Sequence, residues 1–345
     1  MVAAQQKRAC ALCINAQRVF AAFSFEQPPF AAHCTHIKIT IHGAAVSNTF
    51  DHNAAARGYS ELTFTSDDGL RLYARDYAGA SGAARLPVIC IHGLTRNASD
   101  FDEVAPWIAA HGRRVIAVDV RGRGNSEYDR DPAHYHPLVY AGDVVKLMHD
   151  LGIARAVFIG TSMGGLITMT LATRHLHLIA AAVLNDVGPA LSKRGLARIA
   201  GYAGKGEVLR SWSEAAAYLR AINEVAFPDY RDADWDKWAR RAFIETAPGV
   251  LAMRYDASIG LAIRAGQVKT SSMMANFAFK RLARRRPTLL IRGALSDLVE
   301  DEQAAGMRAM APRMAYAVVD RVGHAPMLME PQAREALRAF LAQVD

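Results

Sequence analysis

Short apolar runs alternate with longer stretches of mixed polarity along most of this chain. Each apolar run is nearly continuous and ends in Gly, Asp or Asn, at residues 86–93, 113–120, 154–160 and 179–186. The stretches between them have helical character, as at 99–112 and 137–152. Continuous apolar strands that alternate with amphipathic helices are typical of a parallel sheet covered on both faces. The pattern predicts an α/β fold with a mostly parallel sheet.

The predicted sheet begins with a hairpin and ends near the C-terminus. Residues 60–77 form two strand-like segments around Asp68-Gly69, a dipeptide that strongly favours a tight turn. Two further apolar runs and a closing amphipathic helix lie at 287–293, 314–320 and 332–343. We therefore expect the core domain to comprise residues 57–187 and 287–345.

Residues 188–286 interrupt this core, although connections in α/β folds normally need only a few residues. The segment carries its own helix signals: Ser211 and Glu214 have the spacing of a capping box, and Trp235, Trp238 and Ala242 share one face of a probable helix. We interpret it as a helical cap. Most of its aromatic residues are expected to pack within the cap, and some to line a pocket beneath it.

Residues 1–56 lack clear periodicity and precede the first strand signal, so we interpret them as a loose leader. The alternative is a zinc site, because Cys10 and Cys13 are followed by a second group of soft ligands, at His33, Cys34 and His36. Only one residue separates Cys34 from His36, whereas zinc sites usually use wider spacing. We expect no metal and no cofactor.

Composition places the protein among ordinary globular proteins, with 51% apolar residues and no apolar run long enough to span a membrane. Four scattered cysteines favour a reducing compartment, and we expect a cytoplasmic monomer or homodimer. The net charge of +8 is concentrated in residues 188–286, where 18 Lys and Arg face 9 Asp and Glu. We interpret this excess as a solvated surface rather than a site for acidic partners. No nucleic-acid-binding motif accompanies it.

The strongest chemical signal is the pentapeptide Gly160-Thr161-Ser162-Met163-Gly164, between an apolar strand and a helix. G-x-S-x-G in that position is a nucleophile elbow. Gly160 and Gly164 must lack side chains for the turn to close, and Ser162 must adopt a strained backbone. The helix N-terminus favours a developing negative charge beside the serine. Ser162 is the predicted nucleophile.

A serine nucleophile needs a base, and the base needs a third group that orients it. His324 is the best-placed of the 12 histidines, because it lies in the loop between the last strand and the C-terminal helix. The acid should follow an earlier strand. We prefer Asp297, after the penultimate strand, which gives the order Ser, Asp, His. Asp186 is a rival after the strand that precedes the cap, and Asp301 is a weaker one.

Acyl transfer also requires donors for the oxyanion of the tetrahedral intermediate. The residue after the nucleophile, Met163, supplies one backbone N–H. The loop after the first parallel strand supplies the other, for which we choose Leu94; Gly93 allows the sharp turn there. His92 is expected to organise this loop through hydrogen bonds from its ring to the backbone rather than to act as a base.

Five motifs, in this order and spacing, resemble those of the α/β-hydrolase superfamily: HGLTRNASDF, DVRGRGNS, GTSMGG, LIRGALSDLV and VGHAPMLMEP. They are most similar to motifs of capped carboxylesterases and meta-cleavage-product hydrolases. The resemblance covers about residues 58–345 and is weakest across the cap. Members that use an aspartate nucleophile differ at Ser162. Meta-cleavage-product hydrolases usually have Asn where this chain has Thr161, and Gly-Pro-Gly-Ala where it has residues 94–97.

The resemblance and the predicted triad imply a serine hydrolase that cleaves esters of small hydrophobic molecules through an acyl-serine. An alternative is a hydrolase of C–C bonds, or of lactones, that uses the same residues. A different class is a non-catalytic ligand receptor built on the hydrolase fold, because such receptors can retain the whole triad. The sequence leaves the natural substrate open.

Overall fold

The computed structural model describes residues 58–80 and 85–344. An eight-stranded sheet runs through the centre in the order β1-β2-β4-β3-β5-β6-β9-β10. All neighbours from β4 to β10 are parallel, and β2 is antiparallel to both β1 and β4. The strands are β1 Ser60–Thr65, β2 Arg71–Tyr77, β3 Val88–Ile91, β4 Val115–Asp119, β5 Ala156–Thr161, β6 Ile179–Asn185, β9 Thr288–Gly293 and β10 Ala315–Val319. The α/β prediction is confirmed.

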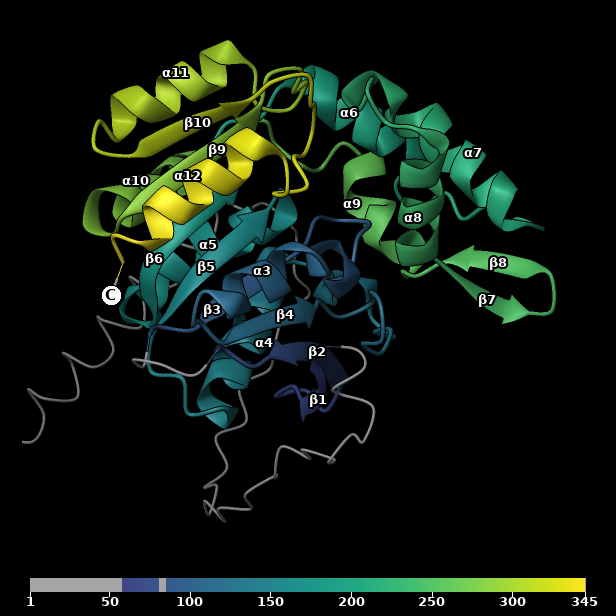
Figure 1. Ribbon diagram of the computed structural model, residues 1–345, viewed down its shortest axis with the longest axis horizontal. Helices are drawn as coiled ribbons and strands as arrows, with labels where there is room; N and C mark the ends of the chain where they lie inside the picture. The colour runs from purple at the N-terminus through teal and green to yellow at the C-terminus, as the bar shows by residue number, and fades with distance from the viewer. Residues whose placement is uncertain (1–57, 81–84, 345) are drawn as a thin grey trace, which may run out of the picture.

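Helices cover both faces of the sheet, which explains why its central strands are continuously apolar. Every residue of β3, β4 and β6 is buried. One face packs against α4 Pro137–Asp150, α5 Met163–Arg174 and α10 Met273–Arg285. The other packs against α3 Val104–Ala110 and α12 Pro331–Leu341, and α11 Asp301–Met310 lies beside β10 (Figure 1).

The segment between β6 and β9 forms a lobe at the end of the sheet where the parallel strands finish (Figure 1). It contains α6 Lys193–Tyr202, α7 Trp212–Asn223, α8 Asp232–Ala242, the hairpin of β7 Phe243–Ala247 and β8 Val250–Met253, and α9 Leu261–Arg264. Trp235, Trp238 and Ala242 are all buried on α8, as their spacing predicts. Ser211 caps α7 through the amide of Glu214. The insert is therefore mainly helical, and it includes a hairpin that the sequence analysis missed.

The last helix of the insert belongs to the core layer. Phe279 and Leu282 of α10 are fully buried in the same apolar cluster as α4 and α5. The part of the insert above the strand ends is therefore shorter than residues 188–286.

No helix within the described residues is long and apolar enough to cross a membrane. Residues 1–57 lie outside the described part of the chain, and with them both interpretations of the N-terminal segment, as a leader and as a zinc site.

Candidate active site

Ser162 occupies a strained turn between β5 and α5. Its backbone has φ 52° and ψ −115°, a conformation that residues with a side chain rarely adopt. The two glycines of the motif make the turn possible. A Cβ on Gly164 would lie 2.0 Å from the carbonyl oxygen of Ile91 in β3, and one on Gly160 would lie 2.5 Å from the backbone of Gly164. The turn thus has the geometry that the pentapeptide predicts.

A chain of two hydrogen bonds joins Ser162 to a buried carboxylate. His324 lies in the loop between β10 and α12, and its Nε2 is 2.9 Å from the Ser162 hydroxyl. Its Nδ1 is 2.8 Å from Oδ2 of Asp186. Asp186 accepts a hydrogen bond, so Nδ1 carries the proton and Nε2 is left to accept the serine proton. This arrangement suits a serine that must be deprotonated as it attacks.

Asp186 is held rigidly at the end of β6. Its side chain is 0% exposed, and its backbone is in the left-handed region with φ 56°. Besides His324, the Ser296 hydroxyl donates to it at 2.6 Å and the Gly293 amide at 3.1 Å. The carboxylate therefore has three donors around it and little freedom to turn away from the imidazole.

The structure corrects the prediction that Asp297 is the acid of the triad. Asp297 binds Arg198 of α6 through two hydrogen bonds of 2.5 and 2.9 Å instead of contacting His324. Strands β6 and β9 are parallel neighbours, so both aspartates reach the same edge of the sheet, and the local backbone decides which faces the histidine. Asp301, the weaker candidate, pairs with Arg292 and is exposed.

Electrostatics agree with this pairing. Burial opposes ionisation of Asp297, but the bound Arg198 guanidinium and nearby His324 hold the pKa of this carboxyl below its usual value. Sequence reasoning did not single out Arg198, because nothing in the local sequence of α6 points to a partner about one hundred residues away.

The loop after β3 lies against the nucleophile. A Cβ on Gly93 would be 3.7 Å from the Cβ of Ser162. His92 is fully buried; its Nδ1 is 2.7 Å from the Gly93 oxygen, and its Nε2 accepts from the Val120 amide at 3.1 Å. Burial lowers the pKa of His92 to about 3, so the ring is only weakly basic, and both of its nitrogens are already bound to the backbone. His92 is therefore a poor alternative to His324 as the base. The ring-to-backbone hydrogen bonds expected of His92 are present in the structure.

These bonds fix the peptide group that carries the Leu94 N–H. The carbonyl of this peptide group belongs to Gly93 and is bound by the His92 ring. In a trans peptide the N–H points away from the carbonyl oxygen, so the Leu94 N–H points away from His92. Met163 begins α5, so its N–H is one of the amides that a helix leaves without an internal partner. The Met163 amide directly follows Ser162, and the Leu94 amide directly follows Gly93, which lies against Ser162; that they hold the oxyanion stays a prediction.

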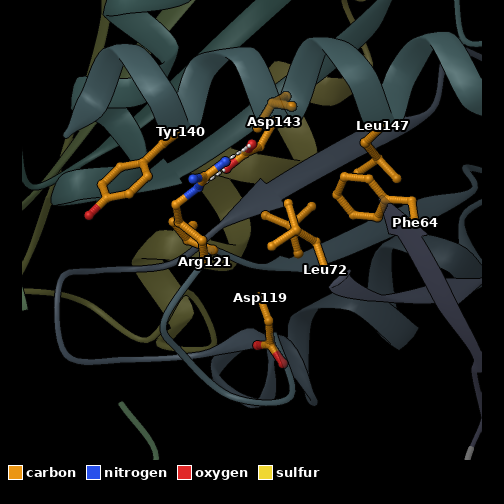
Figure 2. Close-up of a pocket in the computed structure, with 10 residues that line it drawn as sticks. Phe64, Leu72, Asp119, Arg121, Tyr140, Asp143 and Leu147 are labelled. Carbon is orange, nitrogen blue, oxygen red and sulfur yellow. Dashed lines mark hydrogen bonds and ion pairs between the residues drawn. The ribbon is translucent and has the colours of Figure 1, made fainter. Parts of the chain in front are cut away.

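The loop after β4 carries Arg121, which forms ion pairs with three aspartates. Figure 2 shows Arg121 pointing toward Asp143 on α4, with which its guanidinium makes two hydrogen bonds of 2.6 and 2.7 Å. Asp68 and Asp129 bind the same guanidinium. The apolar-lined cavity here measures about 10 Å³, roughly the space for one water molecule. It is too small for a substrate.

A larger cavity of about 710 Å³ lies between α6 and the loop after β9. Arg198 and Asp297 line it, as do Ala226 and Ser296. The cap aromatics pack mainly on one another: Trp235 stacks on Trp238 at 5.7 Å between ring centroids, within a cluster of neighbouring rings. The lining of this cavity contains no aromatic residue, so the aromatic pocket expected from the sequence is not found there.

Comparison with known proteins identifies relatives over most of the chain. The alpha/beta hydrolase family matches residues 88–339. A 3-hydroxybutyrate-oligomer hydrolase of Cupriavidus necator is 34% identical over 256 residues, which are 71% of this chain and 84% of that protein. An esterase of Mycobacterium tuberculosis is 26% identical over 75% of this chain and 85% of its own length.

A solved structure of an alpha/beta hydrolase from Novosphingobium aromaticivorans is also similar. It is 40% identical in sequence and superimposes with a TM-score of 0.77, covering 83% of this chain and 99% of its own. The similarity therefore extends over the core and the inserted lobe alike.

Proposed function

The chain belongs to the alpha/beta hydrolase family, and from this premise we propose that it cleaves carboxylic esters through an acyl-serine intermediate. The observation that carries the proposal is the continuous hydrogen-bonded chain from Ser162 through His324 to Asp186. The esterase and oligomer-hydrolase relatives support ester cleavage rather than another reaction on this fold.

In the proposed mechanism, the Ser162 oxygen attacks the ester carbonyl while its proton passes to Nε2 of His324. Asp186 holds the imidazole in the required tautomer and stabilises its positive charge. The oxyanion accepts hydrogen bonds from the Leu94 and Met163 amides. His324 then gives its proton to the leaving alkoxide, and an alcohol departs. Water, activated by His324, releases the acid and restores Ser162.

We propose small esters of short acids as substrates. One relative, which this chain matches over 84% of that protein's length, is named for the hydrolysis of 3-hydroxybutyrate oligomers. This similarity favours short hydroxyacid esters with a free carboxylate as substrates. The cavity beside α6 is polar, because three ion pairs line it: Arg194–Glu300, Arg198–Asp297 and Arg292–Asp301. This polar lining suits a short ester better than a long acyl chain.

The first prediction tests the nucleophile. Wild-type protein mixed with excess p-nitrophenyl butyrate should release a burst of nitrophenolate equal to about one site per chain, because the acyl-serine forms faster than it hydrolyses. Ser162→Ala should lose the burst and reduce turnover by several orders of magnitude while keeping its circular dichroism and melting temperature. A fluorophosphonate should label Ser162 in the wild type, as read by peptide mass spectrometry.

A substrate panel separates the alternatives. It contains p-nitrophenyl esters of rising acyl length, the linear dimer of 3-hydroxybutyrate, a lactone and a dienoic meta-cleavage product. Highest kcat/KM on the dimer or short esters supports the proposal. Faster cleavage of the meta-cleavage product than of every ester would establish the C–C hydrolase instead, and absence of both burst and labelling would leave the ligand-receptor reading.

A further inference from the structure

The guanidinium of Arg123 is a buried positive charge without a carboxylate partner among the described residues. Its side chain is 0% exposed, and the groups that it contacts are all neutral, including the rings of Tyr135 and Tyr140. Arg121, two positions earlier, is equally buried but is bound by three aspartates. Arginine stays protonated in proteins, and an unpaired buried cation is costly, so Arg123 calls for a reason beyond packing.

The partners of Arg123 include both residues expected to hold the oxyanion. Its Nε donates to the Leu94 carbonyl at 3.0 Å, and its Nη2 lies 3.4 Å from the Met163 sulfur. Its Nη1 donates to the Arg121 carbonyl and to the Tyr140 hydroxyl, each at 2.8 Å. The guanidinium of Arg123 therefore contacts both residues whose amides are expected to hold the oxyanion.

We propose that Arg123 is a positioning residue for the oxyanion hole, a role that rests on the proposed ester hydrolysis. Leu94 is held on two sides: the His92 ring binds the carbonyl of the peptide before it, and Arg123 binds the carbonyl of Leu94 itself. The N–H between these two fixed carbonyls cannot rotate away from the substrate. The uncompensated positive charge also favours negative charge developing nearby, where low dielectric strengthens the interaction.

The loop that carries Arg123 is itself anchored on both sides. The Gly124 amide donates to the Arg254 carbonyl, and the Asp256 amide donates to the Gly122 carbonyl, each at 2.8 Å. The segment 254–256 belongs to the inserted lobe. The loop of Arg123 is thus bound to both the core and the lobe. This holds the guanidinium in one position whether or not substrate is bound, as a preorganised site requires.

The test compares Arg123→Gln and Arg123→Lys with a matched control, Arg113→Gln. Arg113 is also buried and also binds carbonyls, but it precedes β4, whereas Arg123 follows it, so it lies at the opposite edge of the sheet. Each variant is assayed for kcat and KM with p-nitrophenyl butyrate. Each is also assayed for inhibition by a trifluoromethyl ketone, which forms a tetrahedral oxyanion adduct, and by the matching planar methyl ketone. Melting temperature reports folding.

We expect Arg123→Gln to lower kcat by about 10- to 100-fold with KM nearly unchanged, somewhat less than direct loss of an oxyanion donor. Affinity for the trifluoromethyl ketone should fall by the same factor and that for the methyl ketone should not. Arg123→Lys keeps the charge and should be intermediate. Arg113→Gln should lower only the melting temperature.

Two results would overturn the inference: kcat within about twofold of the wild type in folded Arg123 variants, or equal loss of affinity for both ketones. The second result would mean that Arg123 shapes the site as a whole. Failure of the proposed function looks different, because then the wild type itself would show neither an ester burst nor fluorophosphonate labelling of Ser162.

Discussion

At the scale of single residues, two aspartates that follow adjacent strands have different partners: Asp186 binds His324, and Asp297 binds Arg198. Asp186→Asn should lower kcat by about 10³- to 10⁴-fold, because an amide donating to Nδ1 would hold His324 in the wrong tautomer. Asp297→Asn should change kcat by less than about tenfold, because that carboxyl contacts Arg198 instead. Steady-state kinetics on the two isosteric variants make the comparison. A larger loss for Asp297→Asn would restore the assignment made from sequence.

Asp297→Asn should instead lower the melting temperature, in a way that depends on pH. The folded pKa of Asp297 is lowered, so its pairing with Arg198 stabilises the fold above the unfolded pKa, near 3.8, and loses this effect as pH falls through the folded value. The difference in melting temperature between wild type and Asp297→Asn should therefore be present at neutral pH and shrink in the acid range. A difference independent of pH would show that the ion pair contributes little.

The proposed nucleophile and base could be found from sequence because each lies in a local pattern. Ser162 lies in a glycine-framed turn, and His324 follows the last strand. The acid could not, because Asp186 and Asp297 both follow buried strands that turn out to be neighbours. The choice between them depends on the left-handed backbone of Asp186 and on Arg198, and neither is visible in a linear pattern.

At the scale of elements, the elbow depends on how closely α5 approaches β3. Gly164→Ala should destabilise the fold by about 3 kcal/mol or prevent folding, because its methyl group would overlap the Ile91 carbonyl, which cannot move without breaking the sheet. Gly142→Ala is the matched control: this glycine lies in α4, is exposed and has open space around it. It should stabilise by about 0.5–1 kcal/mol.

Urea unfolding followed by circular dichroism measures both variants. Equal stability of Gly164→Ala and wild type would mean that the helix can shift away from β3. In that event the strained geometry of Ser162 would not depend on the glycine.

Elements with a strong period were predictable, and those whose partners lie far along the chain were not. The core strands and the capped helix α7 match their patterns. The hairpin β7–β8 was missed although its Pro-Gly turn, at residues 248 and 249, is a recognisable signal between apolar positions. The helix α10 was assigned to the cap by its position in sequence. Only its packing on α5 shows that it belongs to the core.

At the scale of the whole molecule, the folded chain separates positive charges that the sequence groups together. Five of the basic residues of segment 188–286 lie at the end of α10 or just after it, from Lys280 to Arg286. This end precedes β9, so it lies at the edge of the sheet opposite the strand ends that carry Ser162 and Asp186. Arg286 there binds the carbonyl of Ile179, the first residue of β6. Less of the positive field therefore faces the site than the linear charge count implies.

The last prediction follows from this distribution. An ester with a free carboxylate should have a kcat/KM advantage over its neutral analogue of no more than about tenfold at low salt, at the weak end of electrostatic steering. The advantage should shrink as salt rises, because exposed charges are screened beyond about 8–10 Å at ordinary ionic strength. Arg194→Glu, at the cavity beside α6, should reduce it. Lys280→Glu, at an exposed position of α10, makes the same charge change and should not.

The salt series also distinguishes a general field from a specific contact. Arg198 lines the cavity, and its Nη1 is buried without a hydrogen-bond partner in the described part of the chain. A carboxylate bound there would be shielded from salt, so the advantage would persist at high ionic strength and disappear in Arg198→Gln. Equal effects of Arg194→Glu and Lys280→Glu would contradict both readings, because distance from the site would then not matter. The pair of charge-reversal variants thus tests whether the fold, rather than net charge, governs how an anionic substrate reaches Ser162.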